Sequence, residues 1–71
     1  MAQEKKAGWV MVYSTNEEYK IVILKGLLEE AGIKAYEIDK RDSNYLLGNT
    51  ELYVRGDDVI RTKLIIEKSE L

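Results

Sequence analysis

The order in which hydrophobic periodicities follow one another constrains the fold of this chain more than any other feature. Three short runs are rich in β-forming residues or alternate in polarity, which predicts strands: "WVMVYS" (9–14), "IKAYEID" (33–39) and "ELYVR" (51–55). Two longer segments have helical periodicity, "EEYKIVILKGLLEEAG" (17–32) and "GDDVIRTKLIIEKSEL" (56–71). The predicted order is therefore β-α-β-β-α.

Start and stop signals support the first helix. Thr15 and Glu18 have the spacing of a capping box, and Gly32 stands where a left-handed helix stop is expected. The inward stripe is predicted to contain Ile21, Leu24, Leu28 and Ala31, broadened by Ile23 and Leu27. For the glycine within the helix, Gly26, we expect close packing against the sheet.

The second helix is expected to begin at a cap formed by Asp57 or Asp58 and to turn Val59, Ile60 and Leu64 inward. A weak internal echo at an offset of forty residues relates Tyr13 to Tyr53. This echo fits an α+β, ferredoxin-like split β-α-β fold. The third strand would then lie between the first two in the order 1-3-2 and antiparallel to both, with two helices on one face. We expect a flexible N-terminal tail over residues 1–8 and a single domain over 9–71.

Composition excludes several classes of function. The 71 residues contain no cysteine and no histidine, which argues against thiolate chemistry, a cysteine zinc site and the usual general base. The formal net charge of −2 counts against nucleic acid as a partner. The sequence has neither an apolar leader nor a membrane-spanning run, so we expect a cytoplasmic protein without a membrane partner.

Strand periodicity predicts an uncovered aromatic face. Branched aliphatics such as Val10, Val12, Leu52 and Val54 belong beneath the helices. The other face would then collect six large side chains, namely Trp9, Met11, Tyr13, Tyr36, Ile38 and Tyr53. Soluble monomers rarely leave such a patch bare. Its cover could be the chain's own Tyr45-Leu46-Leu47, a second copy, or the bases of a single-stranded nucleic acid.

The segment between the second and third strands is long and polar for so small a domain. Its Asp42 and Asn44 match two calcium-loop spacings, but the glycine and closing glutamate of that motif are missing. We expect the basic side chains of Lys40, Arg41 and Arg55 to gather near one edge of the sheet. There they could meet a protein or a small anionic ligand. A plain turn formed by Asp42, Ser43 and Asn44 is the structural alternative.

Two strings resemble a known family. "GLLEEAGIKAY" and "DSNYLLGNTELYV", followed by a helix opened by acids, are similar to a small bacterial domain of unknown function described as a prokaryotic signal-transducing protein. The resemblance spans about residues 9–69. It implies a ferredoxin-like fold, loosely grouped with nitrogen-regulatory signal proteins. It also implies a shared surface formed by Asp42, Ser43, Asn44, Tyr45, Gly48, Glu51 and Tyr53.

These observations predict a non-enzymatic binding or regulatory module without a cofactor or metal. We expect it to self-associate as a dimer through the open sheet face or an edge strand. It would present its 40–50 loop to a ligand or partner through Lys40, Arg41, Asp42, Ser43, Asn44, Tyr45, Gly48 and Arg55. The alternative is single-stranded nucleic-acid binding through the aromatic face.

Overall fold

The fold has three strands and two helices in the predicted order. The computed structural model describes residues 8–40 and 49–70. Strand β1 (Trp9–Thr15) leads to helix α1 (Glu18–Glu30), which is followed by strands β2 (Ala35–Asp39) and β3 (Thr50–Arg55). A short 3₁₀ turn, η1 (Gly56–Asp58), then leads into helix α2 (Val59–Ser69). The expected tail falls mostly on residues 1–7, which lie outside the described residues.

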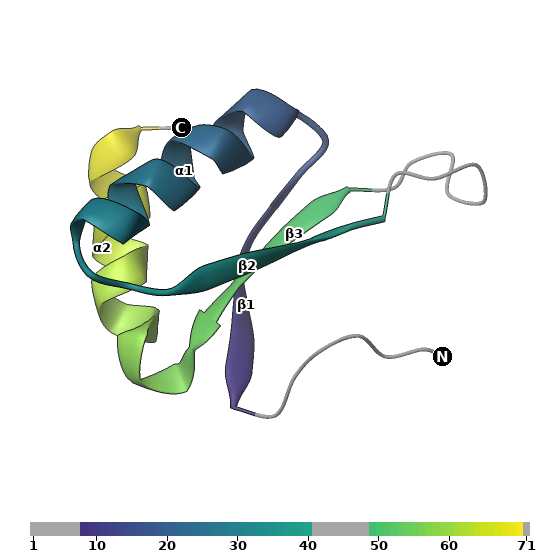
Figure 1. Cartoon of the computed structure of the whole chain (residues 1–71). Coiled ribbons are helices and arrows are strands. Elements are labelled where there is room, and N and C mark those ends of the chain that lie inside the picture. Colours follow the sequence, from purple (N-terminus) through teal and green to yellow (C-terminus); the bar gives the residue numbers. More distant parts are fainter. Residues whose placement is uncertain (1–7, 41–48, 71) are drawn as a thin grey trace.

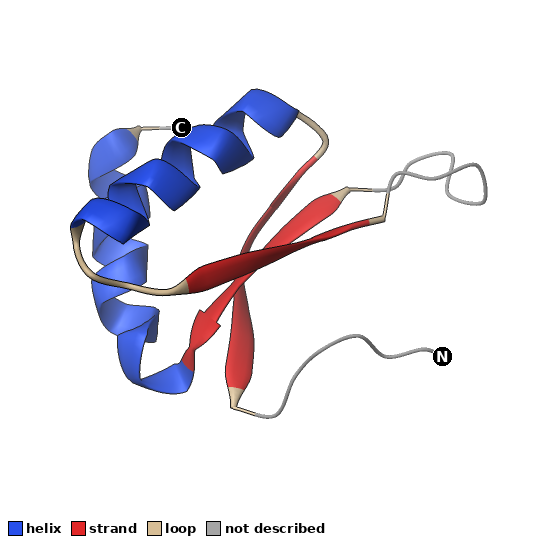
Figure 2. Cartoon of the chain, viewed as in Figure 1, coloured by secondary structure: helices blue, strands red, loops and turns tan. Residues whose placement is uncertain are grey.

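The strands form one antiparallel sheet in the order β1-β3-β2, so β3 pairs with both of the others (Figure 1). Both helices lie on the same side of this sheet, and neither lies on the other side (Figure 2). The α+β fold class, the strand order and the one-sided helix layer are all confirmed.

Helix α1 follows its predicted stripe and stop signal, but not its predicted cap. Ile21, Leu24 and Leu28 are fully buried. The helix ends in a Schellman arrangement: Gly32 has a φ of 78°, and the Ile33 N–H donates to the Leu28 carbonyl over 2.8 Å. At the other end, Thr15 Oγ1 accepts the Glu17 N–H over 3.1 Å, and Glu17 takes the N-cap position without a side-chain cap bond. The predicted capping box is therefore wrong.

The core lies between α1 and the helix-facing side of the sheet. Leu52 and Val54 of β3 are fully buried, and Ile33, which follows α1, is buried in the same cluster. Ala35 and Val12 pack against this cluster from the two outer strands. Because the aliphatic residues of β3 alternate with polar or aromatic ones, the strand turns its branched side chains toward the helices, as predicted.

Helix α2 is rotated relative to the prediction. Ile60 is 76% exposed and Leu64 is also exposed, so their predicted inward positions are wrong. Thr62 is fully buried instead, and Val59, Ile65 and Ile66 pack against the core. Helix α2 begins at Val59, directly after the 3₁₀ turn. With a period of 3.6 residues per turn, positions 62, 65 and 66 lie on the same inward face as Val59.

Two further expectations for α1 are wrong. Ile23 is exposed rather than part of the inward stripe. Gly26 is exposed as well, and a Cβ atom built at this position meets nothing within 4 Å. Close packing against the sheet therefore does not explain this glycine, which costs a helix about 1 kcal/mol relative to alanine.

The buried Thr62 hydroxyl leads to a prediction about stability. Its Oγ1 has no hydrogen-bond partner among the described residues, and an unpartnered buried hydroxyl is destabilising. Replacing the hydroxyl by a methyl in Thr62→Val should therefore raise the free energy of unfolding by about 1 kcal/mol. Urea denaturation followed by circular dichroism measures the change. Thr62→Ser, which keeps the hydroxyl and removes the methyl, should be less stable than the native chain. A Thr62→Val variant no more stable than the native chain would contradict this account.

Candidate functional site

The face of the sheet opposite the helices carries an aromatic cluster drawn from all three strands. Tyr53 of the central strand stacks on Tyr36 of β2, with ring centroids 5.1 Å apart and planes within 8°. Trp9 of β1 meets Tyr36 edge to face at 5.0 Å. Both arrangements are favourable for aromatic rings. Three of the predicted interface residues are thus brought together on one surface.

Strand register assigns the remaining members of this face. Met11 pairs with Tyr53, and Ile38 pairs with Glu51, so both side chains lie on the aromatic side. Met11 is 46% exposed, whereas Tyr53 is only 7% exposed because its neighbours surround it. We call Trp9, Met11, Tyr36, Ile38 and Tyr53 the aromatic face.

Tyr13 does not belong to the aromatic face, which corrects the sequence-based prediction. The register between β1 and β3 shifts between Met11 and Tyr13, so Val12 is the extra residue of a β-bulge and Tyr13 lies opposite Leu52. Tyr13 therefore packs against the core on the helix side. A bulge inverts the alternation of side chains beyond it, and strict alternation cannot anticipate this inversion.

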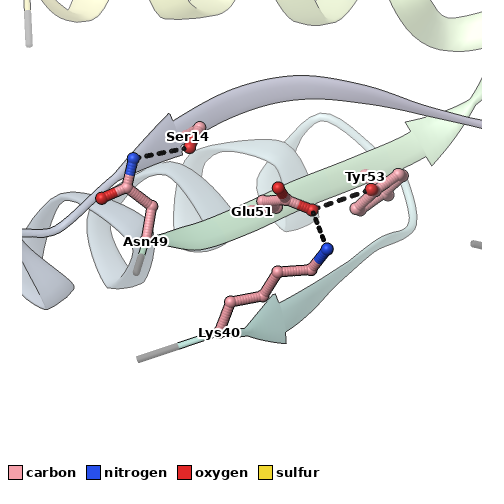
Figure 3. A network of polar contacts seen from close by, with 5 residues as sticks. All are labelled: Ser14, Lys40, Asn49, Glu51 and Tyr53. Atoms are coloured by element: carbon pink, nitrogen blue, oxygen red, sulfur yellow. Dashed lines mark hydrogen bonds and ion pairs between the residues drawn. The ribbon is translucent and has the colours of Figure 1, made fainter. Parts of the chain in front are cut away.

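A polar network lies at the far end of this face, and the bulge brings Ser14 of β1 into it (Figure 3). The Tyr53 hydroxyl donates to Glu51 Oε1 over 2.9 Å, and Lys40 Nζ lies 3.8 Å from the same oxygen. Asn49 Nδ2 donates to Ser14 Oγ over 3.2 Å, which joins the start of β3 to β1. Sequence reasoning missed Ser14 and Asn49, because Ser14 reaches this position only through the bulge.

The same network closes the base of the predicted loop. The Lys40 N–H donates to the Asn49 carbonyl over 3.0 Å, so the two residues that flank 41–48 are held side by side. Most of the predicted loop site lies outside the described residues, namely Arg41, Asp42, Ser43, Asn44, Tyr45 and Gly48.

The predicted gathering of basic residues at one edge is wrong for Lys40 and Arg55, while Arg41 lies outside the described residues. Arg55 pairs with Trp9 at the opposite end of β3 from Lys40. Six residue steps separate Asn49 from Arg55 along the chain, which is about 20 Å of strand. There the guanidinium of Arg55 lies over the Trp9 ring, 5.4 Å from its centroid, in a cation–π contact.

A shallow hollow adjoins the Trp9 end of the aromatic face. Its volume is about 610 Å³, and Trp9, Lys25, Glu29 and the 32–35 segment line it. Lys25 Nζ lies 3.6 Å from Glu37 Oε1, so part of the charge of Lys25 is already balanced. The hollow mixes cationic, anionic and aromatic groups and does not define one ligand class.

The described residues hold no group of three or more histidine, cysteine or acidic side chains that could bind a metal ion. Neither described helix is long and apolar enough to cross a membrane. Within residues 8–40 and 49–70, the chemistry on offer is therefore aromatic stacking, one cation–π contact and hydrogen bonding around Glu51.

A small α+β domain with an aromatic sheet face that no helix among the described residues covers is the class of protein that these features define. Residues 9–70 match the model of the family described as "Putative prokaryotic signal transducing protein", and the chain belongs to that family. Comparison with curated proteins and with solved structures gave no significant match.

The Tyr53 hydroxyl provides a test of the polar network. Tyr53→Phe keeps the stacked ring but removes the hydrogen bond to Glu51, so it should lower the free energy of unfolding by about 1 kcal/mol. Chemical denaturation of both proteins measures the difference. Equal stability of Tyr53→Phe and the native chain would contradict the proposed contribution of this bond.

Proposed function

We propose that this member of a signal-transducing family is a non-enzymatic binding module. In this proposal it self-associates through the aromatic face and presents the 40–50 segment to a partner. The observation that carries the proposal is the packed row of Trp9, Tyr36 and Tyr53 on the side of the sheet that no described element covers. A patch of this kind on a small protein is typical of an interaction surface.

A second copy is the partner that the geometry favours most. Two antiparallel sheets pack face to face when their inner side chains interdigitate, and a two-fold axis then brings the same patch from each subunit together. Met11 and the edges of Tyr36 and Trp9 supply the apolar surface. Tyr53 is already held by Glu51, so this part of the face is ordered before association.

The features of the two edge strands favour self-association through the aromatic face over self-association through a sheet edge. The outer strand β1 contains the bulge at Val12, and bulges hinder edge-to-edge pairing of sheets. The other edge, β2, has only five residues and carries Glu37 and Asp39. Edge pairing is therefore the weaker form of the proposal.

The base of the 40–50 segment lies at the Glu51 end of the aromatic face. Lys40 Nζ lies near Glu51 Oε1, and the Lys40 N–H donates to the Asn49 carbonyl. The two residues that flank 41–48 are therefore held in fixed positions. An acidic group on a protein partner or a small anionic ligand could compete with Glu51 for Lys40, which would couple binding at the segment to the sheet face.

Substitution at Met11 tests self-association. Met11→Glu places a charge in the apolar contact and should raise the dissociation constant of the sheet-face dimer at least tenfold, or about 1.4 kcal/mol. Sedimentation equilibrium over a wide concentration range measures this effect. Val10→Glu is the matched control, because Val10 is the adjacent residue with a similar exposure of 40% but belongs to the opposite face.

A Met11→Glu chain that associates as strongly as the native chain, or a Val10→Glu chain that dissociates as readily as Met11→Glu, would overturn this part of the proposal. So would a native chain that remains monomeric at every concentration. Circular dichroism of each variant separates a loss of association from a loss of fold.

Binding of single-stranded nucleic acid is a second candidate, favoured by the cation–π contact of Arg55 with Trp9 beside Tyr36. Open sheets of this kind can stack bases on aromatic rings and meet phosphate with nearby basic groups. The net charge of −2 favours self-association instead.

A titration of Trp9 fluorescence with a single-stranded oligonucleotide at low salt separates the two functions. Our proposal predicts a flat titration. Quenching that weakens as salt is added would instead support nucleic-acid binding, because phosphate contacts release counterions.

A further inference from the structure

Helix α1 exposes an apolar stripe on the side that faces away from the sheet. Tyr19, Val22 and Ile23 are all exposed, and Val22 reaches 61%. With Gly26 they follow the 19, 22, 23, 26 spacing of a single helix face. Because both helices cover the other side of the sheet (Figure 2), this stripe is separate from the aromatic face.

Gly26 interrupts the stripe, and no packing contact within the described residues requires a glycine there. The residue is exposed, no described atom apart from its chain neighbours and the nearby helix backbone lies within 4 Å of an added Cβ, and alanine would favour the helix. A glycine on an otherwise apolar helix surface leaves a notch. Such a notch allows a bulky group from another helix to approach the backbone closely.

The stripe is self-complementary about its midpoint. Tyr19 and Gly26 are seven residues apart, or two helical turns, and Val22 and Ile23 lie between them. A two-fold axis through this midpoint sets two copies of α1 antiparallel. Tyr19 then lies opposite Gly26 of the partner subunit, and the central aliphatic residues meet one another. Tyr19, the largest side chain of the stripe, thus faces a glycine, which has no side chain.

The helix dipole favours the same orientation. Glu29 and Glu30 stand at the C-terminal end of α1, where acids oppose the helix dipole, and the last turn has no basic residue. The N-terminal end has no side-chain cap; its Glu17 is paired with Lys20 over 2.7 Å, whereas Glu18 adds one acid to the first turn. Antiparallel pairing places the acids of each helix beside the positive dipole end of the other, where the dipole has to outweigh repulsion from Glu18.

We propose that α1 is a second self-association surface, on which α1 of another copy packs antiparallel with Tyr19 seated over Gly26 of the partner subunit. This surface is independent of the aromatic face, so the two together build assemblies larger than a dimer. The apolar stripe is short, and its contact belongs to the weak, transient class of interfaces.

Gly26→Ala gives the sharpest test, because the proposal and a purely structural role predict different results. The added methyl fits the isolated helix, so the variant should be more stable than its parent. The same methyl fills the notch and should raise the dissociation constant of the α1 contact about tenfold. Sedimentation equilibrium in the Met11→Glu background isolates this contact from the aromatic face.

Met11→Glu alone should still form a dimer at high concentration. Adding Gly26→Ala or Val22→Glu should convert it to a monomer. Adding Ile60→Glu is the matched control, because Ile60 is similarly exposed on α2 but lies outside the stripe, and the dimer should persist.

Three results overturn the α1 contact: a Met11→Glu chain that is already monomeric, a Gly26→Ala variant that gains stability without losing association, or an Ile60→Glu variant that dissociates equally. The first of these leaves the aromatic-face proposal intact. Conversely, association that Met11→Glu leaves unchanged and Gly26→Ala abolishes supports the α1 contact alone.

Discussion

Strand β3 is the element on which the rest of this structure depends. It pairs with β1 on one edge and β2 on the other, and its Leu52, Tyr53 and Val54 are all buried. Leu52 and Val54 face the helices, whereas Tyr53 faces the aromatic cluster. One short strand therefore organises both the core and the candidate binding surface, because successive side chains point to opposite faces.

This dual role links the stability of the fold to the order of the candidate binding surface. The helices bury one side of β3, and Tyr36 stacks on the other side while Glu51 receives the Tyr53 hydroxyl. The aromatic face is thus held in place by the same strand that anchors the core. A partner that binds there meets rings that are already ordered, which reduces the loss of conformational entropy on association.

The sequence predicted those parts of the molecule that depend on local pattern. The element order, the strand order and the inward positions of Ile21, Leu24 and Leu28 follow from periodicity and from the Gly32 stop signal. The family assignment is also confirmed. In each case, several residues in one short segment point to the same answer.

The errors came from features that local pattern does not specify. A bulge at Val12 reversed the side of Tyr13 and brought Ser14 into the polar network. The inward face of α2 was mispredicted and Ile60 is exposed, because α2 has apolar residues on several sides and periodicity alone could not choose among them. The misplacement of Arg55 has a different origin, because the predicted antiparallel pairing of β2 and β3 already puts Lys40, just after β2, and Arg55, at the end of β3, at opposite ends of the sheet.

Protection of Trp9 during self-association tests the central claim most directly. Trp9 is the only tryptophan of the chain and lies on the aromatic face, so its accessibility to acrylamide reports on that face. Quenching of its fluorescence should be measured across the concentration range in which the average mass rises. The account predicts that quenching falls as mass increases. A rise in mass with unchanged quenching, or no rise in mass at any concentration, would contradict it.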